Sequence, residues 1–352
     1  MPAPARTLII FHIGSIGDTV VMLPCLHAIA RHYPHHRRIL LTNKPDSARA
    51  SSAESVLEGS GLIHGAEYFP ARLASWRAAF SLLRRLRATR ARTLVYLAPR
   101  TSLRQVRRDR LFFRLAGIRR MLGRPHLATD LERRHEPDGT VEAEAHYLAR
   151  RLAGDLDVDL GPLNWSLHLS EAEQALAQGQ LARLPPARLP VALCPGAKWE
   201  IKNWGEARWA ELVRRLQHAA SPISLVMVGA GDERALAQRL LEHWRGPALN
   251  LCGELTPRET AAVLGRCALL ICHDSGPMHL AATQGTRCVA LFGNLNRPRQ
   301  WYPWGKQHRV LHDGRGVTLI SVESVYAAVT ECLGSIQIPV PSRRVSHLRV
   351  LR

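Results

Sequence analysis

Short apolar runs alternate with longer amphipathic segments through the first half of the chain. The apolar side chains of Thr19–Ala30 and Trp76–Arg87 recur at the spacing of helices with one buried face. Around these segments lie short apolar runs typical of buried strands, the third weaker than the others: Leu8–Phe11, Arg38–Thr42, Ala66–Phe69 and Thr93–Leu97. Strands that alternate with helices predict a mostly parallel, doubly wound sheet.

The same alternation starts again after Pro185-Pro186. The strand candidates here are Leu189–Cys194, Ile223–Val228, Leu249–Cys252, Leu269–Cys272 and Cys288–Phe292, and helical segments follow them. A short amphipathic helix at Glu171–Leu184 comes before the two prolines, and we interpret it as a linker. The chain of 352 residues therefore predicts two Rossmann-like domains, 1–184 and 185–334, that face a central cleft. We expect the basic tail, 335–352, to be mobile.

Two strand-to-helix turns carry the candidate chemistry. In the first, Gly14 and Gly17 permit a tight turn, and Asp18 stands where the next helix begins. A carboxylate here suits either ligand chemistry at the end of a strand or helix capping, and we keep both interpretations. The Gly-x-x-Gly spacing is short of the full dinucleotide-binding fingerprint.

The second turn is Asp274-Ser275-Gly276-Pro277, which follows an apolar run and opens a helix through Met278 and His279. We expect Asp274 or Ser275 to cap that helix, and proline is tolerated in a first helical turn. The unpaired amides of such a helix start, together with its dipole, favour a bound phosphate.

Arginine dominates the charge. The chain has 48 Lys and Arg against 29 Asp and Glu, a formal charge of +19. Such a surface attracts polyanions, or reflects a compositional bias with no single partner. Residues 100–124 predict a basic amphipathic helix and a following element, suited to an anionic membrane, to phosphorylated acceptor groups, or simply to solvent. A nucleic-acid-binding protein is the alternative from another class, but aromatic residues make up only 6% and no DNA-binding motif is present.

The cysteines favour a reducing compartment. They number 7, contain no C-x-x-C pair and lie mostly in apolar runs, which is typical of buried free thiols and not of disulfides or zinc sites. We therefore expect a cytoplasmic protein without a metal. No apolar run reaches the length of a membrane span, so any membrane contact is expected to be peripheral, on the cytoplasmic face.

Four segments in this order together resemble the heptosyltransferase family, inverting glycosyltransferases of the two-domain GT-B fold that build the lipopolysaccharide inner core. They are Ile13–Pro24, Pro195–Trp204, His273–Ala282, and Leu291–Gly293 with Trp301-x-Pro303. The resemblance covers the chain from residue 8 to about 333. It implies ADP-L-glycero-D-manno-heptose as donor, a lipid-linked phosphorylated glycan as acceptor, no nucleic-acid partner and no cofactor.

The resemblance also implies roles for individual residues. Asp18 is expected to be the general base, within an acceptor loop that includes Gly14, Ser15 and Gly17. Lys202, with Lys198 as a second cation, is expected to contact the donor diphosphate. The remaining donor-binding candidates are Asp274, Ser275, Gly276, Pro277, Met278 and His279. For Asp274 the resemblance adds sugar hydroxyls to its capping role, and for His279 we keep both a catalytic and a loop-stabilising role.

Two points stay open at this stage. Some members of the family have Ser or Thr just before the lysine, where this chain has Ala197 and Lys198, so its subgroup is unsettled. The fold alone also permits a different nucleotide-sugar donor or acceptor, or an epimerase reaction on a nucleotide sugar.

Overall fold

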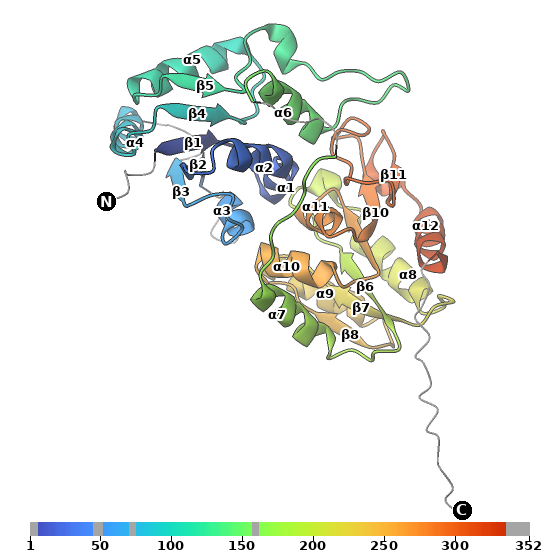
Figure 1. The fold of residues 1–352 in the computed structure, drawn as a ribbon. Helices are drawn as coiled ribbons and strands as arrows, with labels where there is room; N and C mark the ends of the chain where they lie inside the picture. Colours follow the sequence, from blue (N-terminus) through green and yellow to red (C-terminus); the bar gives the residue numbers. More distant parts are fainter. Residues whose placement is uncertain (1–5, 45–51, 70–74, 157–161, 336–352) are drawn as a thin grey trace, which may run out of the picture.

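The computed structural model describes residues 6–44, 52–69, 75–156 and 162–335. They form two α/β bodies that face each other (Figure 1). The tail predicted to be mobile lies outside these ranges, apart from its first residue.

The first body is built on a parallel sheet with the strand order β3-β2-β1-β4-β5 within the described residues. Its strands are β1 (Thr7–Phe11), β2 (Arg37–Asn43), β3 (Ala66–Phe69), β4 (Thr93–Tyr96) and β5 (Arg120–Leu122). Its helices are α1 (Ile16–Val21), α2 (Leu23–His32), α3 (Ala53–Leu57), α4 (Trp76–Ala88), α5 (Leu103–Leu115) and α6 (Glu144–Ala153). The central strand β1 is apolar on both sides because helices cover both faces of the sheet.

The second body repeats this plan with the strand order β11-β10-β9-β6-β7-β8, all parallel, in the described part of the chain. Its strands are β6 (Leu189–Cys194), β7 (Ile223–Met227), β8 (Ala248–Asn250), β9 (Leu269–His273), β10 (Arg287–Phe292) and β11 (Arg309–His312). Its helices are α7 (Glu171–Leu181), α8 (Glu206–Leu216), α9 (Arg234–Leu241), α10 (Pro257–Leu264), α11 (Gly276–Thr283) and α12 (Val322–Gly334). The predicted doubly wound α/β architecture is confirmed.

Three details differ from the sequence prediction. The single helix expected over Thr19–Ala30 begins earlier and is interrupted at Met22, because Pro24 lacks the amide hydrogen that a continuous helix needs. The stretch 100–124 contains a helix, as expected, and then the edge strand β5. The edge strand β11 was not predicted.

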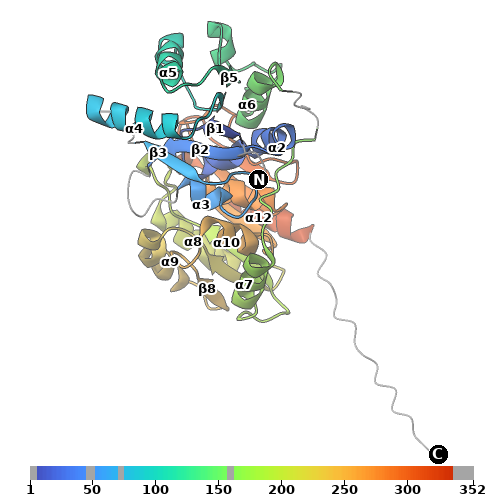
Figure 2. The ribbon, with the colours of Figure 1, turned by 60° about the vertical axis from the view of Figure 1, so that its left-hand side comes forward.

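Helix α7 belongs by its contacts to the second body. It packs against α10, and Glu173 of α7 forms an ion pair with Arg258 of α10 at 2.6 Å. Two views of the molecule show α7 beside α10 in the lower body (Figures 1 and 2). The division at 184/185 separates the two sheets, but we propose a domain boundary before residue 171 because of this packing.

The two bodies touch through a close contact of α1 with α11. A methyl group added at Gly17 would lie 3.0 Å from the His279 ring, and one added at Gly276 would lie 3.0 Å from Ile16. These two glycines therefore set how closely the helices approach. Beneath the contact, one cluster of buried apolar residues runs without a break from the first sheet to the second.

Candidate active site

A cleft of about 600 Å³ lies between the bodies, where the carboxyl ends of the strands of both sheets meet. In parallel α/β sheets this edge is where ligands bind. The first body lines it with Ile13, Gly14, Ser15, Gly17, Asp18, Asn43 and Phe69, and the second with Lys198, Trp199, Lys202, Asp274, Ser275, Gly276, His279, Leu295, Asn296 and Trp301. Ten of the twelve predicted site residues are in this lining, and Pro277 and Met278 are not.

Asp18 lies in the first turn of α1 on one wall of the cleft. One carboxylate oxygen, Oδ2, accepts hydrogen bonds from the Ser15 backbone N–H and from the Ser15 hydroxyl, both at 2.7 Å. This arrangement fixes the orientation of the side chain. Within the described residues no hydrogen bond occupies the second oxygen, Oδ1. The carboxylate can therefore stabilise the helix start with one oxygen and accept a proton from a ligand with the other.

Lys202 stands on the opposite wall. Its ammonium group lies 2.5 Å from Oδ2 of Asp274 and 5.5 Å from the centre of the Trp199 ring. Oδ2 of Asp274 also accepts a hydrogen bond from Asn296. The Asp274 carboxylate thus holds the lysine at the cleft and does not cap its helix, contrary to one of the sequence predictions.

Helix α11 begins at the cleft with Ser275 as its N-cap residue. The Ser275 side chain makes no capping hydrogen bond, and its hydroxyl is buried without a partner in the described structure. Amides in a first helical turn have no partner within the helix, so they are available to a ligand here. Pro277 has no amide hydrogen, and the Met278 side chain points into the core, so any contact from Met278 would be through its backbone.

His273, at the end of β9, holds both ends of the lysine-bearing loop. Its Nε2 accepts the Trp204 backbone N–H at 3.0 Å, and its Nδ1 lies 3.2 Å from the Gly196 carbonyl oxygen. These partners require a neutral ring that carries its proton on Nδ1. Burial lowers the pKa of His273 from 6.5 to about 4, so the ring stays neutral near neutral pH. No role for His273 was predicted from the sequence.

His279 is buried between the walls, 4% exposed, against Gly17. Burial lowers its pKa, while the nearby Asp274 and Asp18 carboxylates act in the opposite direction. Its position fits the loop-stabilising role, since it packs where the two bodies touch. It also reaches the cleft, so the structure leaves the catalytic role open.

Several lining residues were given no role in the predictions from the sequence. Asn43 is the last residue of β2 and accepts the Gly14 backbone N–H at 3.0 Å, so its place after an apolar run was an available signal. Asn296 comes from an irregular segment after β10, where no periodic pattern points to it. Trp301 belongs to the Trp301-x-Pro303 segment of the family resemblance, which gave it no role. Trp199 is 53% exposed, which makes it an apolar surface at the cleft rim.

A half-buried carboxylate, that of Glu233, fills the space under two glycine turns. A methyl group at Gly196 or at Gly229 would lie 1.9 or 2.2 Å from a Glu233 carboxylate oxygen, so a larger residue at either position would displace that side chain. Glu233 accepts the Ala230 backbone N–H at 2.8 Å, and burial raises its pKa. The turn at Gly229 packs around this side chain.

A separate hollow of about 340 Å³ lies after β4, lined by Pro99, Arg100, Thr101, Gln105, Arg133 and Tyr147. Arg100 is paired with Asp109 at 2.7 Å, and the Arg133 guanidinium lies 4.5 Å from the centre of the Tyr147 ring. Arg133 is also ion-paired, with Glu144, so each guanidinium group at this carboxyl edge of the first sheet already has a carboxylate partner. An anionic group in the hollow would meet the remaining N–H donors of the two arginines.

No three His, Cys, Asp or Glu side chains in the described ranges come together in a way that would hold a metal ion. No helix in those ranges is long and apolar enough to cross a membrane.

The two sheets and the cleft between them match solved glycosyltransferase structures. A glycosyl transferase family 9 protein from Veillonella parvula superposes with a TM-score of 0.72 at 19% identity, over 96% of this chain and 99% of that one. E. coli ADP-heptose lps heptosyltransferase II gives 0.66 at 21% identity, over 93% and 98%. E. coli heptosyltransferase WaaC with ADP gives 0.64 at 18% identity, over 93% and 100%. A search of curated protein sequences returns no match.

The fold is thus that of a GT-B-type glycosyltransferase. The model of glycosyltransferase family 9 (heptosyltransferase) matches residues 115–318, more than half of the chain. The chain belongs to that family and is a glycosyltransferase.

Proposed function

We propose that the protein transfers heptose from ADP-L-glycero-D-manno-heptose to the lipopolysaccharide inner core. The observation that carries this proposal is the placement of Asp18 and Lys202 on opposite walls of one cleft. Direct displacement needs a base on the acceptor side and positive charge on the leaving-group side. The fold relatives from E. coli, whose names include ADP-heptose and ADP, support this donor.

The donor diphosphate would lie between Lys202 and the start of α11. Lys202 and the free amides of the first helical turn stabilise the negative charge that grows on the departing ADP. Asp274 keeps the ammonium group in place through its 2.5 Å ion pair. Lys198, in the same lining, supplies a second cation. In this proposal the reaction needs no metal.

The acceptor would approach from the first body. Asp18 removes the proton from an acceptor hydroxyl through its unoccupied oxygen, and the hydroxyl oxygen attacks the anomeric carbon as the bond to the diphosphate breaks. The configuration at that carbon is inverted. The hollow lined by Arg100 and Arg133 supports an acceptor that carries phosphate, since guanidinium groups bind phosphate in a bidentate way.

We also propose that the enzyme works at the cytoplasmic face of the inner membrane, where a lipid-linked acceptor would be held. All seven cysteines are free and buried, which is typical of proteins in a reducing compartment. The basic surface of the first body supports a peripheral contact with anionic lipid.

The test is acceptor-dependent ADP release by the purified full-length protein, with ADP-heptose and truncated lipopolysaccharide. Asp18→Asn should lower kcat by about 10²–10⁴, because the base is lost. Ser15→Ala is the matched control: it removes one hydrogen bond to Asp18 but keeps the carboxylate, so we expect activity within about tenfold of the wild type.

The base, the donor and the acceptor site can each be contradicted by a separate result. Asp18→Asn with nearly full activity would exclude Asp18 as the base. Release of a different nucleoside diphosphate from another nucleotide sugar, with none from ADP-heptose, would replace the donor. Full activity of Arg133→Ala on a phosphorylated acceptor, with unchanged KM, would exclude the arginine hollow as the acceptor site.

A further inference from the structure

Helices α4 and α5 cover the same face of the first sheet. Leu82 and Leu86 of α4 and Phe113 of α5 are buried in the same apolar cluster against the strands. The ends of the two helices are joined by a hydrogen bond from the Arg87 guanidinium to the Leu115 carbonyl oxygen at 2.9 Å. The two helices therefore meet at their carboxyl ends, and we call their combined outer surface the α4–α5 face.

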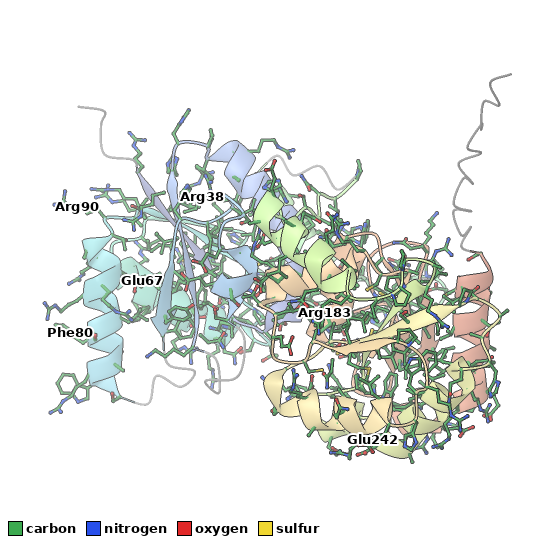
Figure 3. The ribbon with its side chains drawn as sticks, turned by 90° about the horizontal axis from the view of Figure 1, so that it is seen from below. Arg38, Glu67, Phe80, Arg90, Arg183 and Glu242 are labelled. Carbon is green, nitrogen blue, oxygen red and sulfur yellow. The ribbon has the colours of Figure 1, made fainter. Side chains whose placement is uncertain are left out.

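Large apolar side chains stand exposed on the α4–α5 face. Trp76 is 74% exposed and Phe80 is 55% exposed, one helical turn apart on α4. Leu111 is 62% and Leu115 is 53% exposed, one turn apart on α5. Figure 3 shows the Phe80 side of α4 directed away from the rest of the molecule. Four exposed apolar side chains on two adjacent helices have no role in the core, so they indicate an interaction surface.

The same surface is strongly basic. Arg77, Arg84, Arg107 and Arg114 are exposed on it. Helix α4 contains no Asp or Glu, and Asp109, the single carboxylate of α5, is buried and paired with Arg100 and Arg108. The face therefore combines exposed apolar groups with arginines and has no exposed acid on its helices. Helices with this combination bind in the interface of anionic membranes.

The position of the face suits a membrane-held acceptor. In a parallel sheet, each helix begins at the carboxyl edge of the strand before it. Helix α4, which begins with Trp76, is the next described element after β3 along the chain. Phe69, the last residue of β3, lines the cleft. The exposed aromatic end of α4 thus lies toward the edge of the sheet that carries Asp18 and Asn43.

We propose that the α4–α5 face docks this protein on an anionic lipid bilayer, with Trp76, Phe80, Leu111 and Leu115 in the interface and the arginines against the headgroups. This inference builds on the proposed function, which supplies the lipid-linked acceptor, and assigns its membrane contact to particular residues. Its test requires neither donor nor acceptor. The docking proposal and the proposed function can therefore be contradicted separately. If the protein binds anionic vesicles but transfers no heptose, the docking proposal stands and the proposed function is wrong.

The experiment is sedimentation of the full-length protein with vesicles of phosphatidylcholine, with and without phosphatidylglycerol. We expect binding to the anionic vesicles, weakened by salt. Trp76→Ser with Phe80→Ser should lower the partition constant at least tenfold. Arg77→Ser with Arg84→Ser should lower it by about 25-fold, or about fivefold for each arginine. These side chains are exposed, so the variants should keep the wild-type circular dichroism spectrum.

The matched control is Leu319→Ser with Arg245→Ser on the second body. It removes one exposed apolar and one exposed basic side chain far from the face, and it should bind vesicles like the wild type. Unchanged vesicle binding by both face variants would overturn the proposal, as would equal binding to neutral and anionic vesicles. If the wild type is a dimer and a face variant is a monomer that still binds vesicles, the face contacts a second copy of the chain and not a bilayer. If the face variants lose binding to oligonucleotides but still bind vesicles, the face contacts nucleic acid and not a bilayer.

Discussion

Removing His273 tests how the lysine-bearing loop is held. Its ring lies 3.0 Å from the Trp204 backbone nitrogen and 3.2 Å from the Gly196 carbonyl oxygen, and it is completely buried. In His273→Ala both backbone groups remain buried and lose their partners. Because Lys202 stands between the two anchored points, the substitution should loosen the loop as well as destabilise the protein.

The magnitude follows from the two lost hydrogen bonds. A buried backbone group left without a partner costs about 1–3 kcal/mol, so the pair costs about 2–6 kcal/mol. The ring also packs edge-on against Trp209, 5.3 Å between centres, and that contact is lost too. We expect the free energy of unfolding to fall by about 4 kcal/mol, a large part of the roughly 5–15 kcal/mol typical of a folded protein.

Urea unfolding followed by tryptophan fluorescence measures the loss, since Trp204 and Trp209 are buried beside the ring. Donor KM is measured in the ADP-release assay and should rise at least tenfold. His273→Gln should recover part of both effects, because an amide can accept from Trp204 and donate to Gly196.

A second buried histidine provides the control. His308 accepts the Cys288 backbone N–H at 3.2 Å and lies 2.7 Å from the Trp304 carbonyl oxygen, so it makes the same pair of bonds elsewhere in the sheet. His308→Ala should be similarly unstable but keep donor KM near the wild-type value. A loss below about 1 kcal/mol in His273→Ala, or an equal rise in KM for both variants, would refute the reasoning.

Two further predictions concern the domain contact and pH. Gly276→Ala places a methyl group 3.0 Å from Ile16, so it should lower the free energy of unfolding by about 1–3 kcal/mol and reduce kcat by separating α1 from α11. Gly154→Ala is the control, since a methyl group there has nothing within 4 Å and should leave stability unchanged. Equal melting temperatures for the two variants would show that the α1–α11 contact accommodates the methyl group without loss of stability. The pKa values of His12 and His273 are lowered from 6.5 to about 4, so the unfolded chain takes up protons that the folded chain does not. Stability should be constant above about pH 7 and fall as the pH drops from about 6.5 to about 4, by about 2 kcal/mol for each ring at pH 5. Urea midpoints at pH 7.5 and pH 5 test this, and a pH dependence in His273→Ala as steep as in the wild type would contradict it.

The fold could be predicted where burial leaves a clear pattern. The central strands are continuous apolar runs because helices cover both faces, and their ends fix the turns that carry Asp18 and Asp274. The strands β5 and β11 were missed because edge strands are short and half exposed, and each of these begins with arginine. Helix α7 has the pattern of a linker helix, but only its contact with α10 shows which body it joins.

The candidate site could be predicted as far as local turns determine it. Two glycine-containing turns point to Asp18 and to the start of α11, and both line the cleft. Partners that meet only through the tertiary fold left no local signal: Asn296 reaches Asp274 across 22 residues, and His273 reaches Trp204 across 69. The capping role expected for Asp274 was wrong because a lysine and an amide from other segments compete for its carboxylate.

The uninterrupted apolar cluster beneath the α1–α11 contact has a consequence for how the molecule unfolds. Because side chains of both sheets share it, neither half can lose its structure without exposing apolar surface of the other. The protein should therefore melt as a single cooperative unit, with one calorimetric transition for its two sheets. A chimera that exchanges one half with a relative would have to inherit both sides of that contact in order to fold. The candidate cleft is lined by residues of both halves, so the exchange would also change one of its walls.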